Sequence, residues 1–442
     1  MEDSLNNLSN NLTEAFEETI RRIQNLPASR GRLGMETLMY LTHAARIMNV
    51  LELRDVLSVH PTHRRVDAKY RPTEKMILEC CQGLVTVEAR TGDVRTCHYS
   101  VKEYLVGNSP RLFPRAESVI ATKCLRYIML EDFSTGPWEK REDILSRTQD
   151  YPFLSYAARF WGRHARLSQN DEEVQAALDE FFASTRVTAT ANQVRQYSMN
   201  YRPEYWARKE CLSFTPLHLA AREGLTRTVE GLLRTDRFAV NVATTEGGTP
   251  VIHAASGGRV DIVRMLMQRG ADPYLRNWYG NALHCAIESD RASTVRELVV
   301  GWGMDWRGAD GYGLDYLGCV LSRDAAQALE ALVDVGLDIR AHDTEAGGSA
   351  GKTVGYQIFL EACILGRLKI VKLMTERGWV DVNARSARGR TALHYAARSG
   401  RLAVVERLIE VGADVSAKDD DGNSVLHVLQ RLYPSRAVEV SG

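Results

Sequence analysis

One stretch of this chain has the residue types and spacing of a phosphate-binding site. Ala346-Gly-Gly-Ser-Ala-Gly-Lys352-Thr353 matches a relaxed phosphate-loop pattern, with alanine in place of the first glycine. Such a loop must join a buried strand to a helix whose N-terminal N–H groups hold the phosphate. The preceding segment, Ala341-His-Asp-Thr-Glu345, is polar and does not have the composition of a core strand. We interpret the match as chance composition in a surface loop.

Other catalytic and metal-binding patterns are missing from the sequence. The eight cysteines are scattered, without paired spacing and without a histidine at zinc-finger distance. There is no nucleophile elbow and no pair of carboxylates in a cleft pattern. We therefore expect no catalysis, no cofactor and no metal. The alternative, an enzyme, would need a site in the helical region 111–207, where Trp138, Trp161 and Trp206 are expected to pack between helices rather than to hold a ligand.

The bulk composition predicts a globular protein with several structural units. The chain has 442 residues, and 56 Lys and Arg balance 56 Asp and Glu, so no overall basic field attracts nucleic acid. A local basic group, His63-Arg64-Arg65 with Lys69 and Arg71, is interpreted as a solvated loop. No run reaches the ~20 apolar residues of a membrane span, and the N-terminus is acidic and polar, unlike a secretory signal. We expect a cytoplasmic protein, with a nuclear location as the alternative.

Four segments of the second half repeat nearly the same phrase. The first three copies lie roughly 33 residues apart, and the fourth fits after two weaker copies. This period predicts stacked helix pairs that present a long surface to partners. Between the two helices of each unit stands a glycine or an aspartate, residues that accept the left-handed conformation needed to reverse the chain. The copies are Thr215-Pro-Leu-His-Leu-Ala-Ala221, Thr249-Pro-Val-Ile-His-Ala-Ala255, Asn281-Ala-Leu-His-Cys-Ala-Ile287 and Thr391-Ala-Leu-His-Tyr-Ala-Ala397, and the turn residues are Gly224, Gly258, Asp290, Asp324, Gly366 and Gly400.

The second helix of each unit carries an apolar stripe and ends in Gly-x-Asp. Ile262, Val263 and Leu266 form one such stripe, which a neighbouring unit must cover. The glycine caps the helix, and the chain then leaves as an extended finger. The copies of this ending are Gly270-Ala-Asp272, Gly303-Met-Asp305, Gly336-Leu-Asp338 and Gly412-Ala-Asp414.

These phrases resemble the ankyrin repeat almost letter by letter, over about half of the chain. The resemblance implies about seven units over 208–433, followed by a tail at 434–442, with units starting near 213, 247, 280, 311, 355, 389 and 422. The fourth and fifth units have lost the His phrase. The resemblance also implies that His218, His284 and His394 pin the first helix and bridge neighbouring units, so these histidines are expected to be structural.

In ankyrin proteins, partners contact the finger tips and the concave face of the first helices. The resemblance therefore places the partner surface on Trp278 and Tyr279, whose aromatic side chains are of the type that anchors interfaces. Packing of the two rings onto a neighbouring finger is the open alternative. The further candidates are Arg276, Arg385 and Arg388 on fingers, and Arg222 and Arg398 on first helices.

The first half begins with predicted helices and a hairpin. We expect helices over 10–26, 35–48, 51–57 and 73–82, then strands 84–88 and 94–99 around the turn Arg90-Thr-Gly-Asp93, and a helix from Ser100 to Leu105. This order is typical of a winged helix. The predicted fold is mainly α: an N-terminal helix at 1–31, a winged-helix-like domain at 32–110, a helical connector at 111–207 and the repeats.

Two phrases of this half resemble the nucleotide-switch receptors of the NACHT type. His98-Tyr-Ser-Val-Lys-Glu-Tyr-Leu105 is similar to their winged-helix segment, and Leu154-Ser-Tyr-Ala-Ala-Arg-Phe-Trp-Gly-Arg-His-Ala-Arg166 to the connector of fungal NOD-like receptors that end in ankyrin repeats. The resemblance implies that His98 matches the histidine that contacts ADP in complete receptors. The ATPase domain with its phosphate loop is missing from this sequence, so we expect no nucleotide site and a hydrogen-bonded role for His98.

The sequence thus predicts a non-catalytic protein-interaction module derived from a fungal NOD-like receptor. Its expected partner is another protein, and a NACHT ATPase-containing protein is one candidate. The alternative is an ankyrin-type transcriptional coregulator or pathway regulator in the nucleus, and an enzyme with a site in the helical region comes third. Neither a membrane nor a nucleic acid is expected as a partner. Whether an ATPase domain precedes Met1 is left open at this stage.

Overall fold

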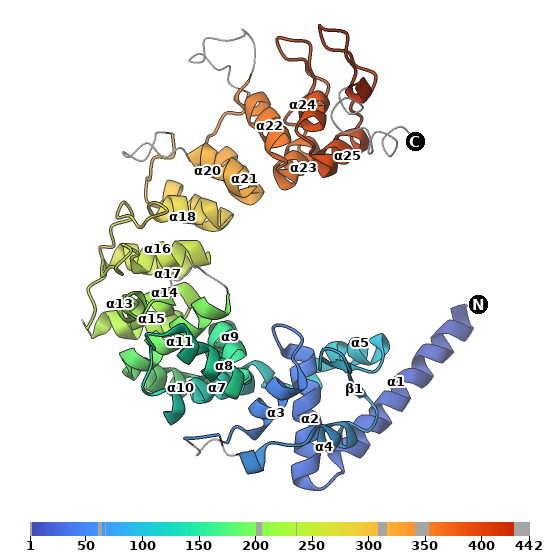
Figure 1. Cartoon of the computed structure of the whole chain (residues 1–442), viewed down its shortest axis with the longest axis vertical. Helices are drawn as coiled ribbons and strands as arrows, with labels where there is room; N and C mark the ends of the chain where they lie inside the picture. Colours follow the sequence, from blue (N-terminus) through green and yellow to red (C-terminus); the bar gives the residue numbers. More distant parts are fainter. Residues whose placement is uncertain are drawn as a thin grey trace. The chain divides into compact units, whose positions relative to one another are not determined.

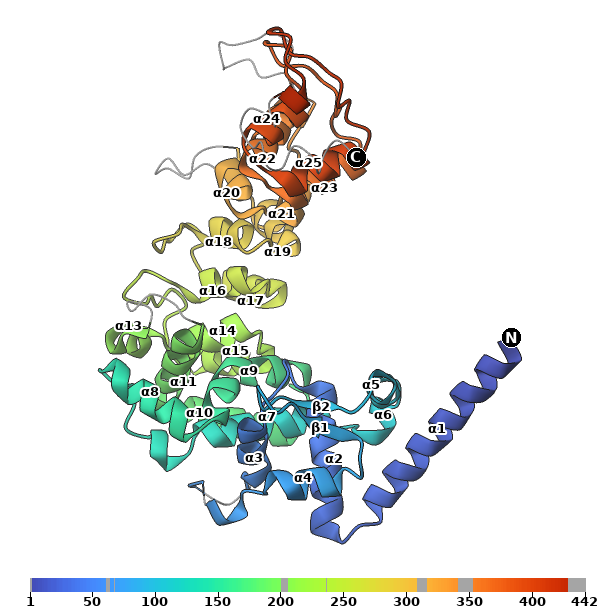
Figure 2. The ribbon, with the colours of Figure 1, turned by 45° about the vertical axis from the view of Figure 1, so that its right-hand side comes forward.

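The computed structural model describes residues 2–60, 64–66, 68–199, 206–235, 237–307, 316–340 and 353–427. The chain divides into two compact units, residues 1–246 and 247–442. Helices dominate both units (Figures 1 and 2), which confirms the predicted mainly α class. Four predicted features lie outside the described residues: His63 of the basic group, the start of the fourth repeat at 313–315, the loop with Lys352, and the tail 434–442.

The first unit opens with the elements of a winged helix. Helices α1 to α4 precede a two-stranded antiparallel sheet, in which Val85 pairs with Thr96 and Val87 with Val94, and α5 follows. The bounds are α1 Glu2–Gln24, α2 Ala28–His43, α3 Val50–Ser58, η1 Ala68–Tyr70, α4 Glu74–Cys80, β1 Val85–Val87, β2 Val94–Thr96 and α5 Tyr99–Gly107.

Helix α2 differs from its predicted span of 35–48, because it begins at Ala28 and ends at His43. Two glycines in its first half explain the early start. A side chain at Gly34 would overlap the carbonyl oxygen of Cys80 and the side chain of Ile23, so the glycine lets α2 approach α1 and α4 closely. After α2 the chain turns extended and joins the wing, where Val94 N–H donates to the carbonyl of Met48 at 3.0 Å.

The connector region is a bundle of helices around an aromatic core. Trp161 is buried against Phe181 and Phe182, at ring-centroid distances of 4.8 and 6.0 Å. Gln193 is bonded to both the N–H and the carbonyl of Trp138 and to the carbonyl of Trp206. The three tryptophans therefore lie among packed helices. The bounds are α6 Ser109–Leu112, α7 Ala116–Ile128, η2 Glu131–Phe133, α8 Arg141–Asp150, α9 Phe153–Leu167, α10 Glu172–Ala183, α11 Thr185–Ser198 and α13 Arg208–Ser213.

Six helix pairs follow in chain order, and the start of a seventh is described at 424–427. The first pair belongs to the first unit and the other five to the second, where Figures 1 and 2 show successive pairs stacked. The predicted domain boundaries stay predictions, and those at 31/32 and 110/111 fall inside α2 and α6. The pairs are α14 Pro216–Glu223 with α15 Thr226–Arg234, α16 Pro250–Gly257 with α17 Val260–Gln268, α18 Ala282–Glu288 with α19 Ala292–Arg296 and its π-helical extension η3 Glu297–Gly301, α20 Tyr316–Arg323 with α21 Ala326–Asp334, α22 Val354–Leu365 with α23 Leu368–Glu376, and α24 Ala392–Arg398 with α25 Leu402–Glu410.

All six predicted turn residues have positive φ, as the sequence required. The two aspartates among them have a second role that the sequence did not reveal. The carboxylate of Asp290 accepts from the N–H of Ala328 at 2.8 Å, and that of Asp324 from the N–H groups of Lys369 and Ile370 at 3.1 and 3.0 Å. Each aspartate thus caps the second helix of the following repeat.

The histidines of the repeated phrase act as structural connectors. His218 and His394 are buried; each bonds its own threonine through Nδ1 and a carbonyl of the next finger through Nε2, at 2.9 Å for Val242 and 3.1 Å for Asn423. His284 stacks on Tyr316 of the next repeat at 4.2 Å. All three therefore serve the packing of repeats, as expected.

Ion pairs join neighbouring second helices in the second unit. Each pair takes an arginine from one repeat and a carboxylate from the next or the preceding one. They are Arg264–Glu297 at 2.7 Å, Arg296–Asp334 at 2.5 Å, Arg377–Glu330, and Arg407–Glu376 at 2.9 Å. Ion pairs near the surface contribute little stability individually.

Candidate protein-interaction surface

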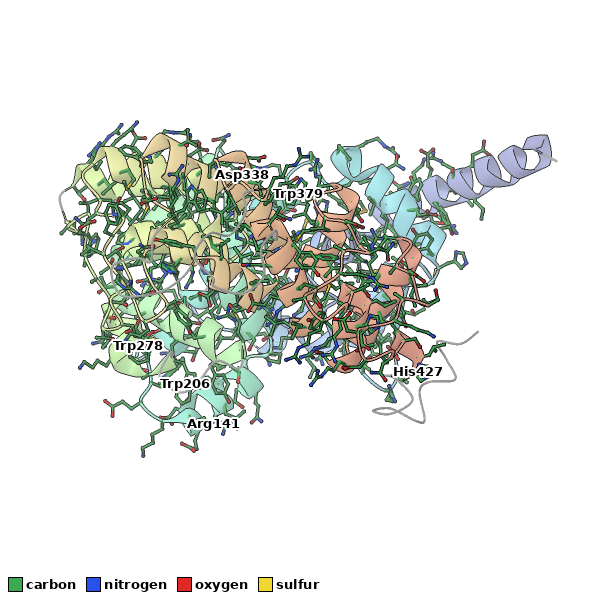
Figure 3. All side chains as sticks on the ribbon, turned by 90° about the horizontal axis from the view of Figure 1, so that it is seen from above. Arg141, Trp206, Trp278, Asp338, Trp379 and His427 are labelled. Carbon is green, nitrogen blue, oxygen red and sulfur yellow. The ribbon has the colours of Figure 1, made fainter. Side chains whose placement is uncertain are left out.

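The finger at 272–280 presents the most exposed aromatic side chain among the described residues of the second unit. Trp278 is 68% exposed, and Tyr274, Leu275 and Tyr279 beside it are exposed as well. Figure 3 labels Trp278 among the side chains of the molecule. Neighbouring exposed apolar side chains are typical of interaction sites, so this finger is a candidate. The sequence pattern pointed to Trp278 and Tyr279 but not to Tyr274 and Leu275. The position of these two residues beside Trp278 depends on the turn at 277–280.

Hydrogen bonds within the finger fix its shape. The side-chain oxygen of Asn277 accepts from the N–H groups of Tyr279 and Gly280 at 2.9 and 3.0 Å, and the main chains of Asn277 and Gly280 bond each other. Asp272 accepts from the N–H of Tyr274 at 2.9 Å and fixes the start of the finger. A rigid finger loses little conformational entropy when a partner binds, which favours affinity.

The aspartate of every Gly-x-Asp ending makes the same bond. It accepts from the N–H two residues further along, and so starts each finger in the same direction. The sequence pattern identified these aspartates without showing this role.

The predicted arginines are not brought together in one patch. Arg276 is half-buried at the base of the aromatic finger, whereas Arg385 and Arg388 are exposed on a finger several repeats away, and Arg398 is exposed on α24. Arg222 is only 12% exposed. Its guanidinium donates to Asn192 at 3.1 Å and to Glu223 at 3.0 Å and lies over the ring of Phe214. Arg222 therefore stabilises the first unit and is not available as a contact residue.

His98 is exposed and starts helix α5. Its Nδ1 accepts from the N–H of Ser100 at 3.2 Å and lies 2.8 Å from the Ser100 hydroxyl. This is the hydrogen-bonded role that the sequence predicted for it. Among the described residues no group of three or more His, Cys, Asp or Glu gathers as metal ligands do.

A second surface feature is a groove between the first helices α20 and α22. It has a volume of about 430 Å³ and is lined by Leu317, Leu321, Ile358, Leu365 and their neighbours. Repeat four has Val320-Leu321 at the position where the first, second and sixth repeats have Ala-Ala. Leu321 of this pair lines the groove.

The first unit contains an arrangement of Ser, His and Glu that resembles a catalytic triad. The hydroxyl of Ser109 lies 2.5 Å from His43 Nε2, and Nδ1 of His43 lies 3.3 Å from Glu117. The other oxygen of Glu117 lies 2.6 Å from Nδ1 of the buried His164, whose Nε2 lies 3.0 Å from the Tyr156 hydroxyl. One assignment satisfies every bond: both histidines donate from Nδ1 to Glu117 and accept at Nε2.

An acyl-transfer site also needs free N–H groups to stabilise an oxyanion. After Ser109, Pro110 has no N–H, and those of Arg111 and Leu112 both donate to the carbonyl of Asn108. No such donor pair stands beside Ser109 in its own helix. We therefore interpret this cluster as structural: it ties α2 and α6 to α7 and α9.

Comparisons with known proteins agree with this architecture. Residues 196–277, 217–310 and 317–419 match the family described as ankyrin repeats (3 copies), and residues 25–112 match the winged helix domain of GPI inositol-deacylase. The chain is thus an ankyrin-repeat protein with an N-terminal winged-helix domain. The predicted winged helix and ankyrin repeats are both confirmed.

Curated relatives and solved structures are similar to parts of this chain. The mouse B-cell lymphoma 3 protein homolog is 28% identical over 221 residues, which cover 48% of this chain and 47% of that protein. Azaphilone pigments biosynthesis cluster protein L of Monascus ruber is 26% identical over 303 residues, which cover 61% of each chain. The chain thus spans about half to three fifths of these relatives. The solved ankyrin domain of Bcl-3 is 27% identical with a TM-score of 0.34, covering 48% of this chain and 93% of that one, and that of human ASB11 is 22% identical with a TM-score of 0.37, covering 52% and 98%.

Proposed function

We propose that this chain is a non-catalytic interaction module whose ankyrin repeats bind a protein partner. The observation that carries the proposal is the rigid finger with Tyr274, Leu275, Trp278 and Tyr279 exposed. Large aromatic side chains on a preorganised loop are the type that supplies most of the binding energy at interfaces. Arg385, Arg388 and Arg398 are further contact candidates on other repeats.

The winged-helix match at 25–112 and the similarity to a Monascus ruber protein support descent from a fungal receptor of the NOD-like class. A NACHT ATPase-containing protein stays one candidate partner. The missing oxyanion donors beside Ser109 support a non-catalytic role. Within the described ranges, no helix combines the length and apolar composition of a membrane span. We propose a cytoplasmic or nuclear location.

Direct DNA binding by the winged helix is not favoured. Helix α4, in the place of a recognition helix, exposes Glu74, Lys75, Met76 and Glu79, so that carboxylates outnumber cations. In the wing, Arg95 is paired with Asp93 at 2.9 Å. A nuclear regulator of this architecture would therefore act through protein contacts, because phosphate contacts need a cationic surface.

The test of the proposed function is a pair of truncations on the finger. Trp278→Ala with Tyr279→Ala is expected to weaken the binding of cellular partners at least about 30-fold, because even one interface hot-spot aromatic contributes about 2 kcal/mol. The measurement is quantitative mass spectrometry of proteins bound to the full chain. Val300→Ala is the matched control, since Val300 is apolar, 72% exposed and lies at the end of the next repeat, away from the finger. Equal recovery with both variants would place the partner surface elsewhere.

A further inference from the structure

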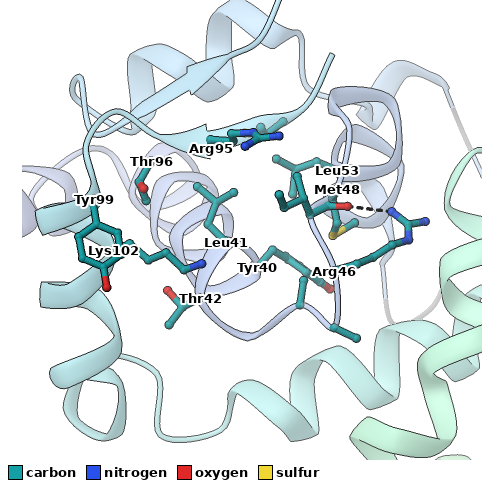
Figure 4. A pocket seen from close by; sticks show the side chains of 14 residues that line it. Tyr40, Leu41, Thr42, Arg46, Met48, Leu53, Arg95, Thr96, Tyr99 and Lys102 are labelled. Carbon is teal, nitrogen blue, oxygen red and sulfur yellow. Dashed lines mark hydrogen bonds between the residues drawn. The ribbon is translucent and has the colours of Figure 1, made fainter. Parts of the chain in front are cut away.

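A cavity of about 450 Å³ lies in the winged-helix domain, far in sequence from the repeats. The end of α2, the segment 44–48, strand β2 and the start of α5 enclose it (Figure 4). Its volume is in the range of small-molecule sites. The chemistry of its lining determines which ligand this space would accept.

The floor of the cavity is apolar, and apolar side chains at its rim are exposed to solvent. Met48, Leu53 and Val94 are buried beneath it. Ile47 and Tyr99 stand at the rim and are 50% and 70% exposed. A ligand with an apolar body would remove both side chains from water, which favours binding by about 25 cal/mol for each Å² of apolar surface buried.

The charged side chains that line the cavity are all cations, and two of them are already neutralised. Arg46 forms a two-point pair with Glu52, at 2.5 and 2.8 Å, and Arg95 pairs with Asp93 at 2.9 Å. The third, Lys102, forms no ion pair with any residue that the structure describes. Figure 4 shows Lys102 directed from α5 into the cavity. One uncompensated positive charge therefore faces the apolar floor.

We propose that this cavity binds a small amphiphilic carboxylate, with the carboxylate on Lys102 and the apolar body over Ile47, Tyr99 and the floor. A single free cation fits a singly charged anion. A phosphate ester carries more charge and is usually held by several cations or a two-point arginine, and both arginines are occupied by Glu52 and Asp93. The proposal is independent of the ankyrin surface, which lies in the other unit.

The test uses a dansyl-labelled medium-chain fatty acid, whose fluorescence rises on transfer from water to an apolar site. With the full chain we expect saturable binding that unlabelled decanoate displaces and decanol displaces at least about tenfold less well, because a hydrogen bond to a charged group contributes about 1.5–3 kcal/mol. Lys102→Gln should lower the affinity about tenfold or more, and Lys102→Arg should retain it. Lys75→Gln, which removes an exposed lysine on α4, is the control and should change nothing.

A second variant fills the cavity without touching its charge. Thr96→Phe places a ring in the cavity from strand β2 and should abolish binding while the helical circular-dichroism signal is kept. Three results would overturn the proposal: no saturable binding, equal displacement by decanol and decanoate, or unchanged affinity in Lys102→Gln. Binding of an acidic peptide with no binding of either carboxylate would likewise assign the cavity to a protein partner and overturn it.

Discussion

Replacing Glu117 by glutamine is expected to destabilise the first unit by about 3 kcal/mol at neutral pH. Burial alone would raise the pKa of this carboxyl, but the hydrogen bonds from His164 and His43 outweigh it and lower the pKa from its ordinary 4.5 to about 2. Since one pKa unit corresponds to about 1.4 kcal/mol, the shift corresponds to roughly 3 kcal/mol of stability. Glutamine has nearly the same shape as glutamate but lacks the carboxylate charge to which His43 and His164 are both bonded.

The pH dependence of this effect has a definite sign. A depressed pKa gives a contribution that is complete above about pH 4.5 and is lost as the pH falls towards 2. Urea unfolding followed by circular dichroism gives the free energy of unfolding of wild type and of Glu117→Gln. The difference between the two values should be constant from pH 7 to 5 and should become smaller below pH 5. Glu131→Gln, which loses only the exposed pair with Arg65, should stay within about 0.5 kcal/mol of wild type. A difference in the free energy of unfolding that grows in acid would contradict this description of the cluster.

Replacing Asp324 by alanine is expected to cost about 2 kcal/mol in the second unit. The residue has a φ of 55°, a conformation that costs a residue with a Cβ roughly 1–2 kcal/mol unless a short polar side chain bonds locally. Alanine also removes the carboxylate that caps α23 through Lys369 and Ile370, a loss of about 1 kcal/mol.

Two further substitutions at this position separate the two contributions. Asp324→Gly removes the cap but accepts the positive φ, so it should cost about 1 kcal/mol, and Asp324→Asn, which can still accept hydrogen bonds, should cost least. Hydrogen exchange of the Lys369 and Ile370 amides should speed up in the order Asn, Gly, Ala. If the glycine variant were more stable than wild type, the carboxylate would have no capping role.

Local patterns predicted the repeats well. Each turn between helices needs a left-handed residue within a few positions of the His phrase, and so Gly224 or Asp290 can be identified from neighbours alone. The same reasoning predicted the wing, whose strands alternate around a short turn. Identification of the exposed aromatic finger followed from the repeat register, because the register decides which residues stand at a tip.

Features that depend on residues distant in sequence were not predictable in this way. Glu117 bonds His43 and His164, and His43 in turn bonds Ser109, so that the cluster joins four helices. No spacing in the sequence indicates that these residues meet. The early start of α2 depends on Gly34 fitting against Cys80, which overrides the poor helix propensity of glycine. Arg222 was expected at a partner surface because its position in the repeat suggested it, and contacts with Asn192 and Phe214 from earlier in the chain bury it instead.

In the proposed complex, the finger around Trp278 contacts the partner protein. Photo-crosslinking tests this contact most directly. A photoreactive phenylalanine analogue would replace Trp278 in one version of the full chain and Val300 in another, and both would be irradiated in cells. The finger position should give a discrete crosslinked protein that the Val300 position does not. Crosslinks at 300 but not at 278, or at neither position, would contradict a partner surface on this finger.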